Sequence, residues 1–226
     1  MKNLTSRQRI LLAVPGFILF IIGDYLLGFG TIGTSSAPNA LYGMEWRVAS
    51  DWRYACSSFL GFVGTAFYAA AAVELLHVME TKYHTGASKL YRLFRIANWG
   101  GILYFAFIHI GLGMLPMVFN AGMAATGDMA ASAAMAVRVA KSIALPLIIG
   151  YIICDGFLTV GWIGMVVRGM LPVRKLAWVC NPVVIAIFGQ LINVITEGLD
   201  AGFESLGWLL LYLVCAVRLV EKEERI

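Results

Sequence analysis

Charged residues are scarce in this sequence: Asp, Glu, Lys and Arg make up 13% of its 226 residues, while hydrophobic residues make up 60%. Soluble domains have about 25% charged and about 45–50% apolar residues, so this composition excludes an ordinary globular protein. A chain this hydrophobic also does not stay disordered in water. At roughly 20 apolar residues per crossing, the length allows six or seven membrane spans and short loops. We therefore expect residues 1–226 to form a single integral membrane domain.

Sequence motifs of the common enzyme and cofactor sites are also missing. There is no P-loop, dinucleotide fingerprint, HExxH or GxSxG, and no lysine lies within an apolar run where retinal could attach. The chain has only three histidines, which disfavours a haem or metal site built from several of them. Its cysteines lack CxxC spacing and fall singly in different apolar segments, as buried small side chains do: Cys56, Cys154, Cys180 and Cys215. We expect no metal and no cofactor.

Six long apolar runs dominate the chain. Each is long enough to cross about 30 Å of hydrocarbon as a helix. A helix satisfies its own backbone hydrogen bonds in lipid, and the runs lack the alternation of barrel strands. The sequence therefore predicts an all-α, polytopic membrane protein with six transmembrane helices. The runs cover approximately residues 10–30, 54–79, 96–119, 142–167, 177–196 and 203–220.

The basic residues are distributed unevenly between the two sets of helix ends. Thirteen of the seventeen Lys and Arg residues fall on the side that carries both termini: Lys2, Arg7, Arg9, Lys82, Lys89, Arg92, Arg95, Arg168, Arg174, Lys175, Arg218, Lys222 and Arg225. By the positive-inside rule both termini are cytoplasmic. The net charge of +4 then reflects membrane orientation, and we expect no nucleic-acid partner. Six acids are predicted to lie on or near the outer side: Glu45, Asp51, Asp128, Glu197, Asp200 and Glu204.

Two outer loops have distinctive sequences. The loop of about residues 31–53 contains Glu45-Trp46-Arg47 and Asp51-Trp52-Arg53, which suit either an interfacial anchor or a lid over a substrate path. The loop of about residues 120–137 is rich in Ala, Gly and Met, and could form a short interfacial helix.

A short internal similarity relates the first run to the fourth. Residues 21–33 and 152–164 agree at 7 of 13 positions, including Asp24 and Asp155. Because these runs cross in opposite directions, the match indicates a 3+3 inverted repeat of halves 1–120 and 138–226, a plan that transporters share. Coincidence within a composition dominated by Ile, Leu, Gly and Val is the alternative.

Ionisable residues within the apolar runs are the candidate site. Asp24 and Asp155 fall near the middle of their runs, where a carboxylate costs roughly 2.5–3.5 kcal/mol. Each should face the bundle interior, paired or protonated, as a proton carrier or as a structural residue. His109 lies at similar depth and is either a packing residue or a proton-exchange partner of one aspartate.

A polar stripe on the fifth run adds to these. Gln190, Asn193 and Glu197 follow i, i+3, i+7 spacing and share one helix face. Three hydrogen-bonding side chains either join helices together or line a cavity open to the outer side.

The beginning of the chain resembles a known type of protein. Residues 4–9, Leu-Thr-Ser-Arg-Gln-Arg, followed by an apolar helix ending Gly-Asp-Tyr-Leu-Leu at residues 23–27, are similar to small uncharacterised membrane proteins of Gram-positive gut bacteria. The similarity covers about the first 30 residues. It implies a bacterial plasma membrane and no particular activity.

Three functions fit these features. The polar residues form the path of a proton-coupled transporter or channel for a small solute, or the two aspartates form the dyad of an intramembrane hydrolase. Six-helix prepilin-type aspartyl peptidases have this size, but their GxGD motif differs from Ile-Gly-Asp24 and Ile-Cys-Asp155. A lipid- or sterol-binding module is the third. The partners are membrane lipids and a small solute or lipid ligand, and the sequence leaves open whether the protein is a homodimer.

Overall fold

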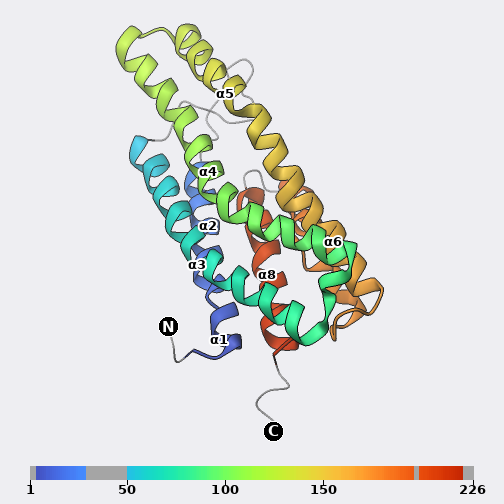
Figure 1. Ribbon diagram of the computed structural model, residues 1–226. Helices are drawn as coiled ribbons and strands as arrows, with labels where there is room; N and C mark the ends of the chain where they lie inside the picture. The colour runs from blue at the N-terminus through green and yellow to red at the C-terminus, as the bar shows by residue number, and fades with distance from the viewer. Residues whose placement is uncertain (1–3, 29–49, 196–198, 221–226) are drawn as a thin grey trace.

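The computed structural model describes residues 4–28, 50–195 and 199–220, and every regular element within these ranges is a helix. Five helices are long and apolar enough to cross a membrane, which makes this an all-α, multi-helix protein of membrane type. Figure 1 shows them as an elongated bundle in which α1, the end of α3 and the end of α8 lie at one end.

The first crossing combines α1 (Ser6–Ile10) and α2 (Ala13–Gly28). Thr5 begins it with a capping box, in which its hydroxyl accepts from the Gln8 N–H and the Gln8 side chain accepts from the Thr5 N–H. Arg9 then forms an ion pair with Glu74 of α3, with 3.1 Å between Nη1 and Oε2. This contact links α1 to the second half of α3.

Helices α3 (Asp51–Tyr83) and α4 (Lys89–Thr126) form the longest part of the bundle. They are joined by His84, whose φ of 49° turns the chain, and by the short helix η1 (Thr85–Ala87). The side chain of Ser88 then caps α4 by accepting from the Leu90 N–H. The turn is short, so α3 and α4 pack side by side.

A second long hairpin is formed by α4 and α5 (Met129–Tyr151). The expectation of a loop over residues 120–137 is wrong, because α4 continues to Thr126 and α5 starts three residues later. Alanine favours helix strongly, and the turn needs only Gly127, with a φ of 66°, and the cap Asp128. At 1.5 Å per residue, the 38 residues of α4 span about 57 Å, well beyond a bilayer core of about 30 Å.

The chain continues from α5 through a π-helix, η2 (Ile152–Phe157), into α6 (Leu158–Val167). The 3-10 helix η3 (Lys175–Val179) follows, and then α7 (Pro182–Asn193), which Asn181 caps by accepting from the Val184 N–H. Because η3 and this cap take the first part of the predicted run 177–196, α7 has only 12 residues. Its length is about 18 Å, short of the roughly 30 Å core.

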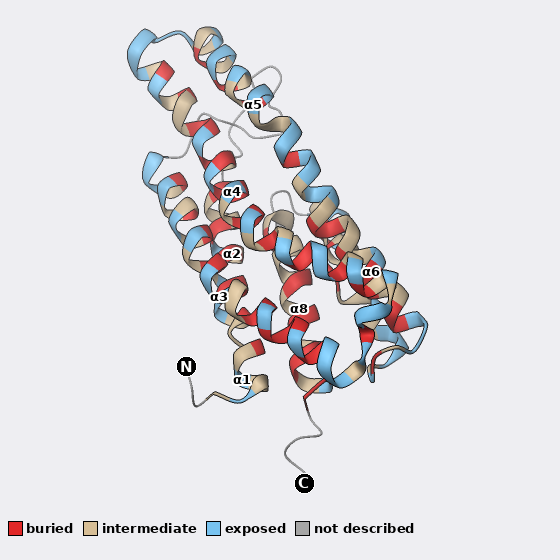
Figure 2. Cartoon of the chain, viewed as in Figure 1, coloured by how far each residue is buried: buried red, intermediate tan, exposed pale blue. Residues whose placement is uncertain are grey.

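The last helix, α8 (Phe203–Arg218), follows η4 (Leu199–Gly202) and completes the bundle. It packs against both α2 and α7, while α2 lies along α3 and α6 lies against α4. Figure 2 shows buried residues on the facing sides of these helices and exposed ones on the outer sides. Many of the outward side chains are large and apolar, such as Phe59, Phe62 and Leu103, as expected for surfaces that meet lipid.

A polar network ties three helices together in the inner half. Asn98 of α4 is fully buried, and its Oδ1 accepts from the hydroxyls of Tyr68 on α3 at 3.2 Å and Tyr212 on α8 at 2.5 Å. The Asn98 amide in turn donates to the Phe94 carbonyl. This network fixes α3, α4 and α8 relative to one another. It was not predicted from the sequence.

Candidate functional site

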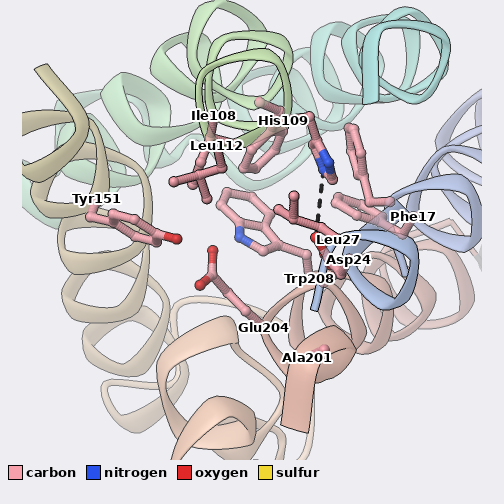
Figure 3. Close-up of a pocket in the computed structure, with 13 residues that line it drawn as sticks. Phe17, Asp24, Leu27, Ile108, His109, Leu112, Tyr151, Ala201, Glu204 and Trp208 are labelled. Carbon is pink, nitrogen blue, oxygen red and sulfur yellow. Dashed lines mark hydrogen bonds and ion pairs between the residues drawn. The ribbon is translucent and has the colours of Figure 1, made fainter. Parts of the chain in front are cut away.

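The candidate site is a cavity of about 200 Å³ between α2, α4, α5 and α8. Figure 3 shows its labelled side chains converging from these helices. The lining combines two carboxyl groups, one imidazole, one hydroxyl of serine and a wall of aromatic rings. The lining residues are Phe17, Phe20, Asp24, Leu27, Phe105, Ile108, His109, Leu112, Tyr151, Ala201, Glu204, Ser205 and Trp208.

Asp24 projects into the cavity from α2 and contacts two other helices. Its Oδ2 accepts a hydrogen bond of 2.6 Å from the Ser205 hydroxyl of α8. Its Oδ1 lies 3.7 Å from Nε2 of His109 on α4, the interaction that the dashed line marks in Figure 3. His109 was expected to be either a packing residue or a partner of an aspartate. Its position beside Asp24 is compatible with both roles.

His109 is held in place by close packing. Its ring stacks on Phe20, with centroids 5.2 Å apart and planes 12° from parallel. Gly61 of α3 lies directly against the ring, so that an added Cβ would overlap the His109 side chain, and Gly23 of α2 lies on another side. Nδ1 is buried without a hydrogen-bond partner among the described residues. Gly61 is therefore needed to bring the imidazole next to Asp24, while Gly23 makes a close but less restrictive contact with it.

Asp155 lies in the π-helix η2 and is 5% exposed. Its Oδ1 accepts a 2.9 Å hydrogen bond from the indole N–H of Trp208. Its Oδ2 is buried, and no N–H or neutral hydroxyl donor reaches it within the described part of the chain. The carboxyl group of Glu204 lines the same second cavity as Asp155. Two carboxyl groups beside one cavity repel each other when both are ionised, so a proton on one of them would relieve that repulsion.

Glu204 is the site residue that sequence reasoning missed. It was predicted only as one of six acids on or near the outer side. In the structure it lies in the first turn of α8 and lines both the main cavity and a second cavity of about 220 Å³. Figure 3 shows its carboxyl group pointing between Tyr151 and Trp208. The sequence did contain an indication of this position. Glu204 and Trp208 are four residues apart, so their side chains lie on the same face of the helix.

The two aspartates therefore line neighbouring cavities instead of one. Asp24 lines the main cavity, and Asp155 lines the second one, together with Gln190 of α7. Tyr151 and Glu204 belong to both linings, so Glu204 connects the two acids.

The polar stripe of α7 is only partly in the site. Gln190 lines the second cavity, is exposed and donates a hydrogen bond to Asp200. Asn193 is partly buried and lines neither cavity. Glu197 and the segment Glu45-Trp46-Arg47 lie outside the described residues.

The end of the main cavity nearer to α1 is lined by aromatic rings. Phe17 and Trp208 stack there, with centroids 6.0 Å apart and planes 19° from parallel. Tyr68 and Tyr212 are in ring contact with both, and they join the Asn98 network. Leu27 and Ala201 also line the cavity.

The described residues that line the cavity carry carboxyl groups and neutral groups, and His109 is the ionisable base among them. No Lys or Arg is among these described lining residues. Within the described ranges, no three His, Cys, Asp or Glu residues cluster closely enough to hold a metal ion. Its chemistry is that of carboxyl groups, hydroxyl groups, an imidazole and aromatic faces.

Comparison with known proteins gives a family and no activity. No curated protein and no solved structure matches the chain. One protein family matches residues 1–222, nearly the whole sequence, and it is described as a family of unknown function. The chain thus belongs to the family of unknown function DUF6796.

Proposed function

We propose that this protein is a proton-coupled transporter of a small solute, and that Asp24, Asp155 and Glu204 are its proton-binding groups. The observation that carries the proposal is three carboxyl side chains gathered between helices of membrane-spanning length. Ionisable groups are costly in this setting and are typical of ion and substrate pathways. Glu204 shares one cavity with Asp155 and another with Asp24, so a proton and a solute have a common set of binding groups.

The shape of the cavity supports alternating access. Its outer end is lined by Leu27 and Ala201, and its inner end is closed by stacked rings and the Asn98 network. This is the arrangement of a site closed toward the inner side. Movement of α8 relative to α2 would separate Phe17 from Trp208 and open that side.

The proposed topology has six crossings, with both termini on the cytoplasmic side of a bacterial plasma membrane. It is supported by the described basic residues Arg7, Arg9, Lys89, Arg168 and Arg218, which belong to helix ends at one end of the bundle. The short α7 supplies the remaining crossing, fifth in chain order, together with the segment before it. The inverted repeat stays a prediction. Its halves pack differently, since α2 packs extensively along α3 while α6, from the corresponding fourth run, makes few contacts with α7.

A second candidate is an intramembrane hydrolase, and one observation favours it. The carboxyl groups of Asp155 and Glu204 line one cavity, as a general acid–base pair does. This pair differs from the expected Asp24–Asp155 dyad. The hydrolase predicts cleavage of peptide substrates that is lost in Asp155→Asn and Glu204→Gln.

Reconstitution into liposomes with a trapped pH-sensitive dye tests transport. A panel of cationic, anionic and neutral solutes of small size is applied, one gradient at a time. We expect at least one solute to drive proton movement in the wild type, and Asp24→Asn or Glu204→Gln to abolish it. The control Glu80→Gln alters an exposed acid paired with Arg95 and should transport normally. If no solute moves protons through the wild type, the proposal is wrong.

A further inference from the structure

Resting on the proposed function, a second inference concerns the solute itself. We propose that the main cavity binds a small organic cation, a substituted ammonium ion. Its lining combines three properties that together select this class: carboxyl groups with no Lys or Arg among the described lining residues, aromatic walls, and a volume suited to a compact molecule.

Charge is the first property. Asp24 and Glu204 face the cavity from the neighbouring helices α2 and α8, and Asp155 shares the second cavity with Glu204. Among the described residues that line the main cavity there is no Lys or Arg to attract an anion. A carboxylate out of water needs a cation or a proton beside it, which a bound ammonium ion supplies. An anionic solute would instead add to the repulsion.

Aromatic walls are the second property. Five of the thirteen lining residues are Phe, Tyr or Trp: Phe17, Phe20, Phe105, Tyr151 and Trp208. Phe105 and Trp208 meet edge to face at 5.1 Å, and Phe20 meets Phe105 at 5.2 Å, which keeps this wall rigid. Aromatic faces attract alkylammonium groups through their quadrupoles and also contact the methyl or methylene groups. A sugar or polyol would find few hydrogen-bonding partners on such a wall.

Size is the third property. The cavity has about 200 Å³, and a cavity of about 150 Å³ is enough to hold benzene. A ligand of roughly six to ten non-hydrogen atoms therefore fits. A bare inorganic cation does not suit the site, because it needs several oxygen ligands and most of this surface is aromatic or aliphatic.

The test measures binding to the purified full-length protein in detergent by titration calorimetry. The probes are choline and 3,3-dimethyl-1-butanol, which has the same shape with a carbon in place of the charged nitrogen. We expect choline to bind at least about tenfold more tightly than the neutral isostere, a difference of about 1.4 kcal/mol. Equal affinity for the two probes, or loss of choline binding in equimolar sodium chloride, would overturn the inference.

Variants assign the binding to this cavity. Glu204→Gln and Asp24→Asn should each weaken choline binding by at least about tenfold. The control Glu80→Gln should leave it unchanged. Two separate acids are tested because one variant alone could fail to fold, which size-exclusion chromatography would reveal. Choline binding that is unaltered in both folded variants would place the site elsewhere and refute the proposal.

Failure of this inference is distinguishable from failure of the transport function. A protein that binds choline through Glu204 but moves no protons for any solute is a binding protein, and the transport proposal falls alone. A protein that couples protons to a neutral or anionic solute and ignores choline is a transporter with another substrate, and the cation inference falls alone.

Discussion

Tyr212→Phe and Asn98→Leu should destabilise the protein in a non-additive way, because both alter one interhelical hydrogen bond. Tyr212→Phe removes the donor and leaves Asn98 Oδ1 with its second partner, the Tyr68 hydroxyl. We expect a loss of about 0.5–1.5 kcal/mol in the free energy of unfolding, within the range of such bonds between membrane helices.

Asn98→Leu has a larger expected effect. Tyr68 keeps an acceptor, since its hydroxyl also lies 3.1 Å from the backbone carbonyl of residue 98. Tyr212 is fully buried and loses its side-chain acceptor, so about 1–3 kcal/mol is expected. In the double variant the unpaired hydroxyl no longer exists. Adding Tyr212→Phe to Asn98→Leu should therefore cost almost nothing or restore stability.

The assay is unfolding by sodium dodecyl sulfate in mixed micelles, followed by circular dichroism, for the wild type, both single variants and the double variant. The predicted coupling energy is about 1 kcal/mol. Strict additivity of the two single losses would refute the network as a linkage between α4 and α8. The matched control Tyr83→Phe removes a bond to the Leu219 carbonyl at the inner end and should add independently.

Three further predictions address packing, topology and surface charge. Gly61→Ala should displace His109, costing about 1–3 kcal/mol in the same unfolding assay and reducing transport; unchanged values would contradict the packing. The topology is tested by single cysteines in a background whose native cysteines are replaced by Ala. An impermeant maleimide applied to intact cells should label Ala125→Cys but not Ala87→Cys. The reverse labelling pattern would show that the predicted orientation is wrong. Glu74→Gln should cost less than about 1 kcal/mol at low salt, because its partner Arg9 is 36% exposed, with the loss shrinking as salt is added.

The helical fold class could be predicted from the sequence, because the backbone N–H and C=O groups of each apolar run must form their hydrogen bonds within the run when it lies in lipid. It also located Asp24, Asp155 and His109, since an ionisable residue deep in an apolar run stands out against its neighbours. Those expectations depend on composition and depth alone. The structure adds the contacts: Ser205 and His109 for Asp24, and Trp208 for Asp155.

Features that depend on packing between distant segments could not be predicted from the sequence. Glu204 follows the start of its apolar run by one residue, and only the packing of α7 and η2 around α8 buries it in the site. The loop predicted at residues 120–137 became helix because nothing but Gly127 and Asp128 interrupts a stretch of strong helix formers. The short α7 likewise reflects a local cap at Asn181, which an average hydrophobicity over a long window does not detect.

The central claim is that the carboxyl groups of Asp155 and Glu204, which line one cavity, together bind a proton and exchange it with the outer solution. Infrared difference spectroscopy of the reconstituted protein between two pH values measures it directly, through the C=O stretch of a protonated carboxyl group. We predict a titrating band that disappears in Asp155→Asn and also in Glu204→Gln, because either substitution removes the pair, and that persists in Glu80→Gln. A band that survives both substitutions, or no titrating carboxyl band in the wild type, would contradict the account.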